Sequence, residues 1–151
     1  MNNNNTLIDS LIASHILKSA TLIKAFRAVD RADFVRKEYQ NEAYEDYPLP
    51  IGCDQTISQP TTVAFMLERL DPQGGEKILD VGSGSGWTTA LLAHLIGEKG
   101  SVYGVEIISE LVAFGKENLA QYIFPHAHIE QAHPDTLGLP EHAPFDKILV
   151  S

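Results

Sequence analysis

The stretch Lys77–Trp87, KILDVGSGSGW, constrains the fold of this chain more than any other part of the sequence. Within its first five residues, Ile78, Leu79 and Val81 form a short apolar, β-branched run that is typical of a buried strand. Gly82–Gly86 follows at once, and the helical pattern Trp87–Ile96 comes directly after it. Glycines in such a turn permit positive φ and let a ligand approach the backbone, while free N–H groups at the helix start face the same space. The pattern therefore predicts a nucleotide-like ligand at a strand-turn-helix unit, with a purely structural turn as the alternative.

A second apolar run, Ser101–Val105, ends at Glu106, which lies 24 residues after Gly82. An acidic residue at the end of the strand next to a glycine turn can accept hydrogen bonds from both hydroxyls of a ribose. This position makes Glu106 a candidate ligand-binding residue. The alternative is that Glu106 merely begins the next loop.

The length and charge of the chain limit the classes of protein to which it can belong. A chain of 151 residues with 44% apolar residues is one domain with enough material for a core. The net charge of −9 and the 11 scattered basic residues argue against a nucleic-acid partner, because phosphate binding needs clustered Lys and Arg. A cationic or neutral ligand suits this composition better.

The single cysteine, Cys53, excludes an internal disulfide and a multi-cysteine zinc site. No base lies near Cys53 in sequence, so a small buried or loop thiol is the better interpretation than a nucleophile. His126, His128 and His133 lack carboxylate or thiol partners at a spacing that closes a metal site, and we expect no metal. No signal peptide or apolar span of membrane length is recognisable, and these features predict a cytoplasmic protein that does not contact membranes.

The N-terminal part reads as helical. The polar run Met1–Asn5 is expected to fray. Apolar residues at helical spacing then mark two helices, over Leu7–Ile16 and Leu22–Val29. The segment Asp30–Glu42 has alternating charges and few apolar anchors, so we expect short turns or a broken helix there, without chemistry.

The segment Tyr44–Pro60 differs in composition, with three prolines after its start and few helix formers. It predicts an ordered loop that feeds a helix marked by Val63, Met66, Leu67 and Leu70, with Pro60 in the first turn. Long loops inside compact domains are often functional. Ser58 lies at the junction, either as a helix cap or as a functional hydroxyl.

The remaining elements alternate. We expect a helix over Ser109–Tyr122 capped by Ser109, and strands over Ala127–Ala132 and Phe145–Val150. Alternating strands and helices predict an α/β fold, a parallel sheet with helices on both faces. The ligand should lie at the carboxyl ends of the strands, near Gly82–Gly86, Glu106 and the pair Pro134-Asp135.

Four motifs together resemble a known family: AYEDYPLPIGCDQTISQP, KILDVGSGSGW, VYGVE and GLPEHAPFDKILV. In this order and spacing they resemble the protein-L-isoaspartate (D-aspartate) O-methyltransferases, over about residues 17–151. The resemblance implies a Rossmann-like class I methyltransferase with an N-terminal helical extension. It also implies S-adenosylmethionine as cofactor and the free carboxylate of isoaspartyl residues in damaged proteins as the methyl acceptor. We expect residues 1–60, the N-terminal helices and active-site loop, and residues 61–151, the cofactor-binding part, to form one structural unit.

The resemblance also implies site residues. Ser58 would be the active-site hydroxyl near cofactor and substrate. The expected cofactor contacts are Thr56, Ile57 and Ser58 in the same loop, Gly82, Ser83 and Gly84 on the methionine side, and Glu106 at the ribose. The family usually carries Gly-Asp-Gly in the third-strand loop, where this chain has His133-Pro134-Asp135. Asp135 is one position late and would serve the adenine side if the loop is bulged.

The family pattern continues for several strands beyond FDKILV, whereas this sequence stops at Ser151. The later strands of the fold would be missing, and residues 145–150 would form an open apolar edge that favours weak activity and self-association. Three interpretations remain open: a fragment of such an enzyme, a natural short form that binds without catalysis, and a methyltransferase with another acceptor. A nicotinamide-dependent oxidoreductase is disfavoured, because the GxGxG turn has no catalytic tyrosine–lysine pair after it.

Overall fold

The structure is a computed structural model that describes residues 2–151. Its α-helices are α1 (Asn4–Ala13), α2 (Ala20–Ala28), α3 (Pro60–Leu70), α4 (Trp87–Ile96) and α5 (Ser109–Leu119). Three short 3₁₀ helices are η1 (Arg31–Phe34), η2 (Lys37–Glu42) and η3 (Pro140–His142). The strands are β1 (Leu49–Gly52), β2 (Gln55–Ile57), β3 (Lys77–Val81), β4 (Ser101–Glu106), β5 (Ala127–Gln131) and β6 (Lys147–Val150).

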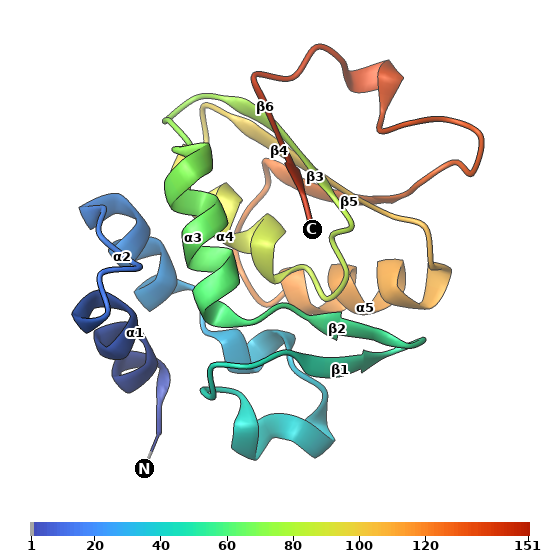
Figure 1. Cartoon of the computed structure of the whole chain (residues 1–151). Helices are drawn as coiled ribbons and strands as arrows, with labels where there is room; N and C mark the ends of the chain where they lie inside the picture. Colours follow the sequence, from blue (N-terminus) through green and yellow to red (C-terminus); the bar gives the residue numbers. More distant parts are fainter. Residues whose placement is uncertain (1) are drawn as a thin grey trace.

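The main sheet has four parallel strands in the order β5-β4-β3-β6. At the centre of β3, Leu79 pairs with Tyr103 of β4 and with Ile148 of β6. The glycine turn therefore leaves the sheet from a central strand, and β6 lies at an edge (Figure 1). The α/β class, predicted from the alternation of elements, is confirmed.

The two faces of the sheet are covered differently. Ile78, Val102, Ile129 and Leu149 belong to the large buried cluster that includes residues of α3, α4 and α5. Leu79 and Val105 belong to a smaller cluster on the opposite face, together with Leu139 from the loop that carries η3. Because successive residues of a strand point to opposite faces, the apolar run of β3 contributes to both clusters.

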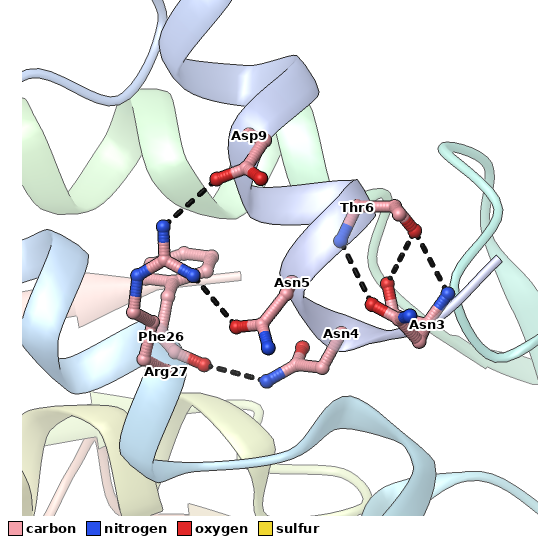
Figure 2. A network of polar contacts seen from close by, with 7 residues as sticks. All are labelled: Asn3, Asn4, Asn5, Thr6, Asp9, Phe26 and Arg27. Carbon is pink, nitrogen blue, oxygen red and sulfur yellow. Dashed lines mark hydrogen bonds and ion pairs between the residues drawn. The ribbon is translucent and has the colours of Figure 1, made fainter.

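The start of the chain is capped. The Asn3 side chain accepts a hydrogen bond from the Thr6 backbone N–H at 3.0 Å, and the Thr6 hydroxyl accepts one from the Asn3 N–H at 2.8 Å (Figure 2). Asn5 accepts a hydrogen bond from Arg27 of α2 at 2.6 Å in the same view. The expected fraying is therefore wrong for Asn3–Asn5, because a reciprocal cap satisfies the first N–H groups of α1. Met1, which belonged to the same prediction, lies outside the described residues.

The N-terminal helices pack onto the sheet-bearing part. The Phe26 ring of α2 meets the Trp87 ring of α4 edge-to-face, with centroids 5.8 Å apart. The Tyr122 hydroxyl accepts a hydrogen bond from the Asp30 N–H at 2.9 Å and donates one to Asp33 at 2.6 Å. Residues on both sides of residue 60 thus share one core.

The segment expected to be a plain loop contains the antiparallel hairpin β1-β2, which the sequence did not predict. Cys53 lies in its turn and is exposed. The short turns expected over Asp30–Glu42 are confirmed as η1 and η2. The predicted Ser109 cap is wrong, because α5 is capped by Ile108 without a side-chain hydrogen bond. Within residues 2–151, no helix combines the length and apolar composition needed to cross a bilayer.

Candidate functional site

The glycine turn has the backbone that its composition predicts. Gly82, Gly84 and Gly86 have φ values of 82°, 52° and 90°, in the left-handed region that favours glycine. The turn is fixed to the neighbouring strand, since the Val105 carbonyl accepts hydrogen bonds from the N–H groups of Gly82 at 2.9 Å and Ser83 at 3.0 Å. Gly86 then caps the N-terminus of α4. The first N–H groups of that helix remain available to a ligand.

The glycine turn also packs closely against α5. A Cβ added at Gly115 would lie 2.8 Å from the Gly84 carbonyl oxygen, and one added at Gly86 would lie 3.0 Å from the Gly115 oxygen. The Asn118 side chain of α5 also donates a hydrogen bond to the Ser85 carbonyl at 2.9 Å. Glycine inside a helix costs about 1 kcal/mol relative to alanine. The close approach of the turn explains why α5 carries one.

A small cavity separates the glycine turn from the segment that follows the hairpin. It encloses about 30 Å³ and is lined by Thr56, Ile57, Ser58, Gly82, Ser83, Gly84, Ser85, Trp87, Thr88 and Ser151. Six of the eight residues expected from the sequence, those of the loop and of the turn, therefore line one space. This space holds about one water molecule. A nucleotide-sized ligand needs more room than this space gives.

Glu106, the last residue of β4, is joined to the turn. Its side chain is buried, and its two oxygens accept hydrogen bonds from the N–H groups of Gly84 and Ile108, both at 3.0 Å. A carboxylate has about four acceptor positions, so two remain for the hydroxyls of a ribose. Glu106 therefore does more than begin a loop, because it braces the glycine turn.

Asp80 of β3, two residues before the glycine turn, is a buried polar residue that sequence reasoning missed. It is fully buried, and one carboxylate oxygen accepts hydrogen bonds from the Thr88 and Thr89 hydroxyls, both at 2.7 Å. Burial raises the pKa of Asp80, and the nearby charge of Glu106 raises it further, against those two hydrogen bonds. Its other oxygen and the Ser83 hydroxyl are buried without a partner among the described residues. The available signal was one acidic residue in an otherwise apolar strand before the turn.

Ser58 does not cap α3. The N-cap residue is Gln59, and the first turn is instead satisfied by the Asp46 carboxylate, which accepts from the Thr61 N–H at 2.8 Å and the Thr61 hydroxyl at 2.6 Å. The capping interpretation of Ser58 is therefore wrong. Its backbone carbonyl accepts a hydrogen bond from Arg31 at 3.2 Å. Ser58 is also one of the residues that line the cavity.

Asp135 lies apart from this arrangement. It is exposed in the loop after β5, and its N–H donates a hydrogen bond to the His133 ring at 3.2 Å. It does not line the cavity between Ser58 and the glycine turn. Its contact with an adenine stays a prediction.

Among the described residues, one group of side chains has metal-ligand spacing. The candidate atoms of Glu130, Glu141 and His142 lie within 4.8 Å of one another. The His142 ring lies in hydrogen-bond contact with Glu130 at 3.1 Å, and this contact brings the two side chains together without a metal. The sequence did not suggest the group, because β5 and η3 bring it together only in the fold.

Comparisons with known proteins agree with one another. The sequence profile of the family described as Protein-L-isoaspartate(D-aspartate) O-methyltransferase (PCMT) matches residues 2–151. A protein-L-isoaspartate O-methyltransferase of Aeropyrum pernix is 45% identical over 145 residues, which cover 96% of this chain and 56% of that protein. One of Anaeromyxobacter dehalogenans is 46% identical over 136 residues, 89% of this chain and 63% of that protein.

A solved structure is similar over nearly the whole chain. It comes from Plasmodium falciparum, was assigned as a protein-L-isoaspartate O-methyltransferase and contains S-adenosyl-L-homocysteine. The TM-score is 0.87 at 27% identity, and the match covers 99% of this chain and 73% of that one. The chain spans 56% and 63% of the lengths of the two curated relatives above, which is less than two thirds.

Proposed function

This chain belongs to the protein-L-isoaspartate(D-aspartate) O-methyltransferase family, and on that premise we propose that it binds S-adenosylmethionine and methylates the free carboxylate of isoaspartyl residues in damaged proteins. The observation that carries the proposal is the single cavity between Ser58 and Gly82–Gly84. Ser58 from one chain segment and the glycine turn from another line this cavity together. A relative of known structure contains S-adenosyl-L-homocysteine, the demethylated form of this cofactor.

The residues at the turn fit the proposed cofactor. S-adenosylmethionine carries a sulfonium and an ammonium group, and the buried Asp80 carboxylate has an oxygen without a partner among the described residues. A cation next to this oxygen stabilises the ionised form of a carboxyl group whose pKa burial has raised. Gly82, Ser83 and Gly84 would contact the methionine part, and Glu106 would accept from the ribose hydroxyls. From its loop, Asp135 would reach the adenine side.

The proposed reaction needs little acid–base catalysis by the protein. The bound cofactor supplies an electrophilic methyl group, and a carboxylate is already a nucleophile at neutral pH. The chain must therefore align the acceptor and exclude water, because opposite charges are lost in the transition state and water stabilises the separated ions. In this scheme Thr56 and Ile57 shape the wall, and the Ser58 hydroxyl orients the acceptor carboxylate without attacking it.

Calorimetry and a methyl-release assay test the proposal. We expect the chain to bind S-adenosylmethionine and S-adenosyl-L-homocysteine but not NAD. Any methyl transfer should occur with an isoaspartyl peptide and not with the same peptide containing aspartate. Ser58→Ala should lower kcat more than it raises KM for the peptide. Ser109→Ala, at an exposed serine outside the cavity, is the matched control. Binding of NAD alone, or equal turnover of both peptides, would contradict the proposed function.

The edge of the sheet supports a proposal on association. Ile148 and Val150 of β6 are 54% and 68% exposed, beside a groove formed with Leu79, Val81 and Phe145. An exposed apolar edge strand pairs readily with another strand. We propose that the chain self-associates through residues 145–150 at micromolar concentration. Sedimentation should show dimers or larger species that Ile148→Lys disperses, and a monomer for the parent chain would refute this.

The compartment is a proposal as well. The exposed, unpaired Cys53 supports a reducing compartment such as the cytoplasm. Labelling of Cys53 by a thiol reagent in intact cells, after rapid quenching, would test it. A thiol found fully oxidised would contradict the assignment.

A further inference from the structure

Arg31 is a buried cation in a segment where the sequence predicted no chemistry. It belongs to η1 and its exposed fraction is 0%. None of the ion pairs among residues 2–151 includes it. Removing a guanidinium from water without a partner is expensive, so its polar contacts must compensate for the lost hydration.

Four backbone carbonyls accept hydrogen bonds from the guanidinium, whose Nε is buried without a partner among the described residues. One terminal nitrogen of Arg31 donates to the carbonyls of Ala43 at 2.8 Å and Glu45 at 3.1 Å. The other donates to the carbonyls of Tyr47 at 3.0 Å and Ser58 at 3.2 Å. The first three acceptors lie before the hairpin β1-β2 and the fourth lies after it. A single side chain therefore ties both ends of the hairpin segment together.

The same guanidinium also contacts the other wall of the cavity. Its central carbon lies 5.4 Å from the centroid of the Trp87 ring. Trp87 is the first residue of α4, directly after the glycine turn, and it lines the cavity together with Ser58. Arg31 thus touches the segment that carries Ser58 and the helix that carries the turn.

We propose that Arg31 is a positioning residue that holds the Ser58 segment at a fixed distance from the glycine turn. A planar guanidinium presents five donors in a fixed arrangement and can lie flat on an aromatic ring, whereas an ammonium is a point charge with three donors. Lysine could not satisfy the four carbonyls and the ring at once. The consequence for methyl transfer rests on the proposed function, but the clamp itself does not.

Burial lowers the pKa of Arg31 to about 10, while the charge of Asp46 acts in the opposite direction. The side chain therefore remains charged at neutral pH. No ion pair joins Asp46 to Arg31 among the described residues, and the Asp46 oxygens accept hydrogen bonds from Thr61 at the start of α3. The clamp is thus a charged donor with neutral acceptors, which gives each hydrogen bond more strength than a neutral pair would have.

Amide hydrogen exchange read by mass spectrometry tests the clamp in the chain as it exists. We compare the parent chain with Arg31→Met and with Arg31→Lys, which keeps the charge and is the second variant if methionine prevents folding. Arg27→Met is the matched control, since Arg27 lies nearby on α2 and makes only exposed contacts with Asn5 and Asp9. Exchange in residues 43–58 should rise by on the order of tenfold or more in both Arg31 variants, with β4 unchanged.

Fluorescence gives a second readout, because Trp87 is the one tryptophan of the chain. Quenching of Trp87 by acrylamide should increase in the Arg31 variants and not in Arg27→Met. Exchange that stays at the parent level in residues 43–58, or rises equally in every segment, would overturn the clamp.

Kinetics then connect the clamp to catalysis. If the parent chain turns over an isoaspartyl peptide, Arg31→Lys should lower kcat by on the order of tenfold, with the affinity for S-adenosyl-L-homocysteine within about twofold of the parent value. A loss of cofactor affinity equal to the loss of kcat would overturn the positioning role. A parent chain that binds no S-adenosyl-L-homocysteine would contradict the proposed function. The clamp would then be tested by the hydrogen-exchange experiment alone.

Discussion

Replacing Gly115 by alanine separates helix propensity from packing at the glycine turn. By propensity alone, alanine would stabilise α5 by about 1 kcal/mol. The added Cβ, however, would lie 2.8 Å from the Gly84 carbonyl oxygen and 3.1 Å from the Ile129 side chain. The end of the Ile129 side chain can shift slightly, but a backbone oxygen at 2.8 Å cannot yield without moving the turn or the helix.

Overpacking of this kind costs about 1–3 kcal/mol. Subtracting the propensity gain leaves an expected loss of about 0–2 kcal/mol in the free energy of unfolding, where propensity alone predicts a gain of about 1. Each kcal/mol shifts the melting temperature of a chain of this size by about 2–4 °C. Because the Gly84 carbonyl is part of the turn, the affinity for S-adenosyl-L-homocysteine should fall as well.

Urea unfolding and calorimetry measure both effects. Ala113→Gly is the matched control, since Ala113 is an exposed position on the same helix, two residues away. It should lose about 1 kcal/mol by propensity and leave ligand affinity unchanged. If Gly115→Ala gained as much stability as Ala113→Gly lost, the close approach of α5 and the turn would have no energetic weight and the reasoning would be refuted.

Four further predictions concern charged groups and the turn. Glu106→Ala should weaken binding of S-adenosyl-L-homocysteine by about 1.5–3 kcal/mol in calorimetry, and Gly84→Val should abolish it, because a side chain at φ 52° is strained and its Cβ would lie 3.3 Å from Ile51. Burial raises the pKa of Asp80, so the native state holds its proton more tightly than the unfolded state. Stability should therefore fall as pH rises from the unfolded pKa of about 3.9 to the native one, and urea titrations of Asp80→Asn should lose this fall. At Glu68 burial would raise the pKa, but hydrogen bonds from Ser19 lower it overall. The gap in melting temperature between the parent and Glu68→Gln should therefore close as pH drops through the native pKa.

Local patterns were sufficient to predict β3, α4 and β4 with their observed ends. A glycine marks two of these boundaries: Gly82 follows β3 and Gly97 follows α4. The period of the apolar residues, 2 in strands and 3.6 in helices, locates the other element boundaries to within a few residues. The resemblance of the motifs was likewise sufficient to choose six residues that line one cavity.

What the sequence could not show depends on partners far away in the chain. Arg31 looked like one more charge in a mixed segment, because its acceptors are backbone carbonyls, which no residue type reveals. The hairpin β1-β2 was hidden because prolines mask the alternation of short strands. Ser58 was one position from a plausible cap, and only the contact of Asp46 with Thr61 shows that α3 begins without it.

The contact of Tyr122 with Asp30 and Asp33 also bears on how the chain is made. Asp30 and Tyr122 are 92 residues apart in sequence. At synthesis rates of about 5–20 residues per second, the N-terminal helices wait roughly 5–20 s before this tyrosine leaves the ribosome. During that interval α2 also lacks α4, against which Phe26 packs. The N-terminal helices are thus translated early, but their packing against α4 and the contact with Tyr122 are completed late.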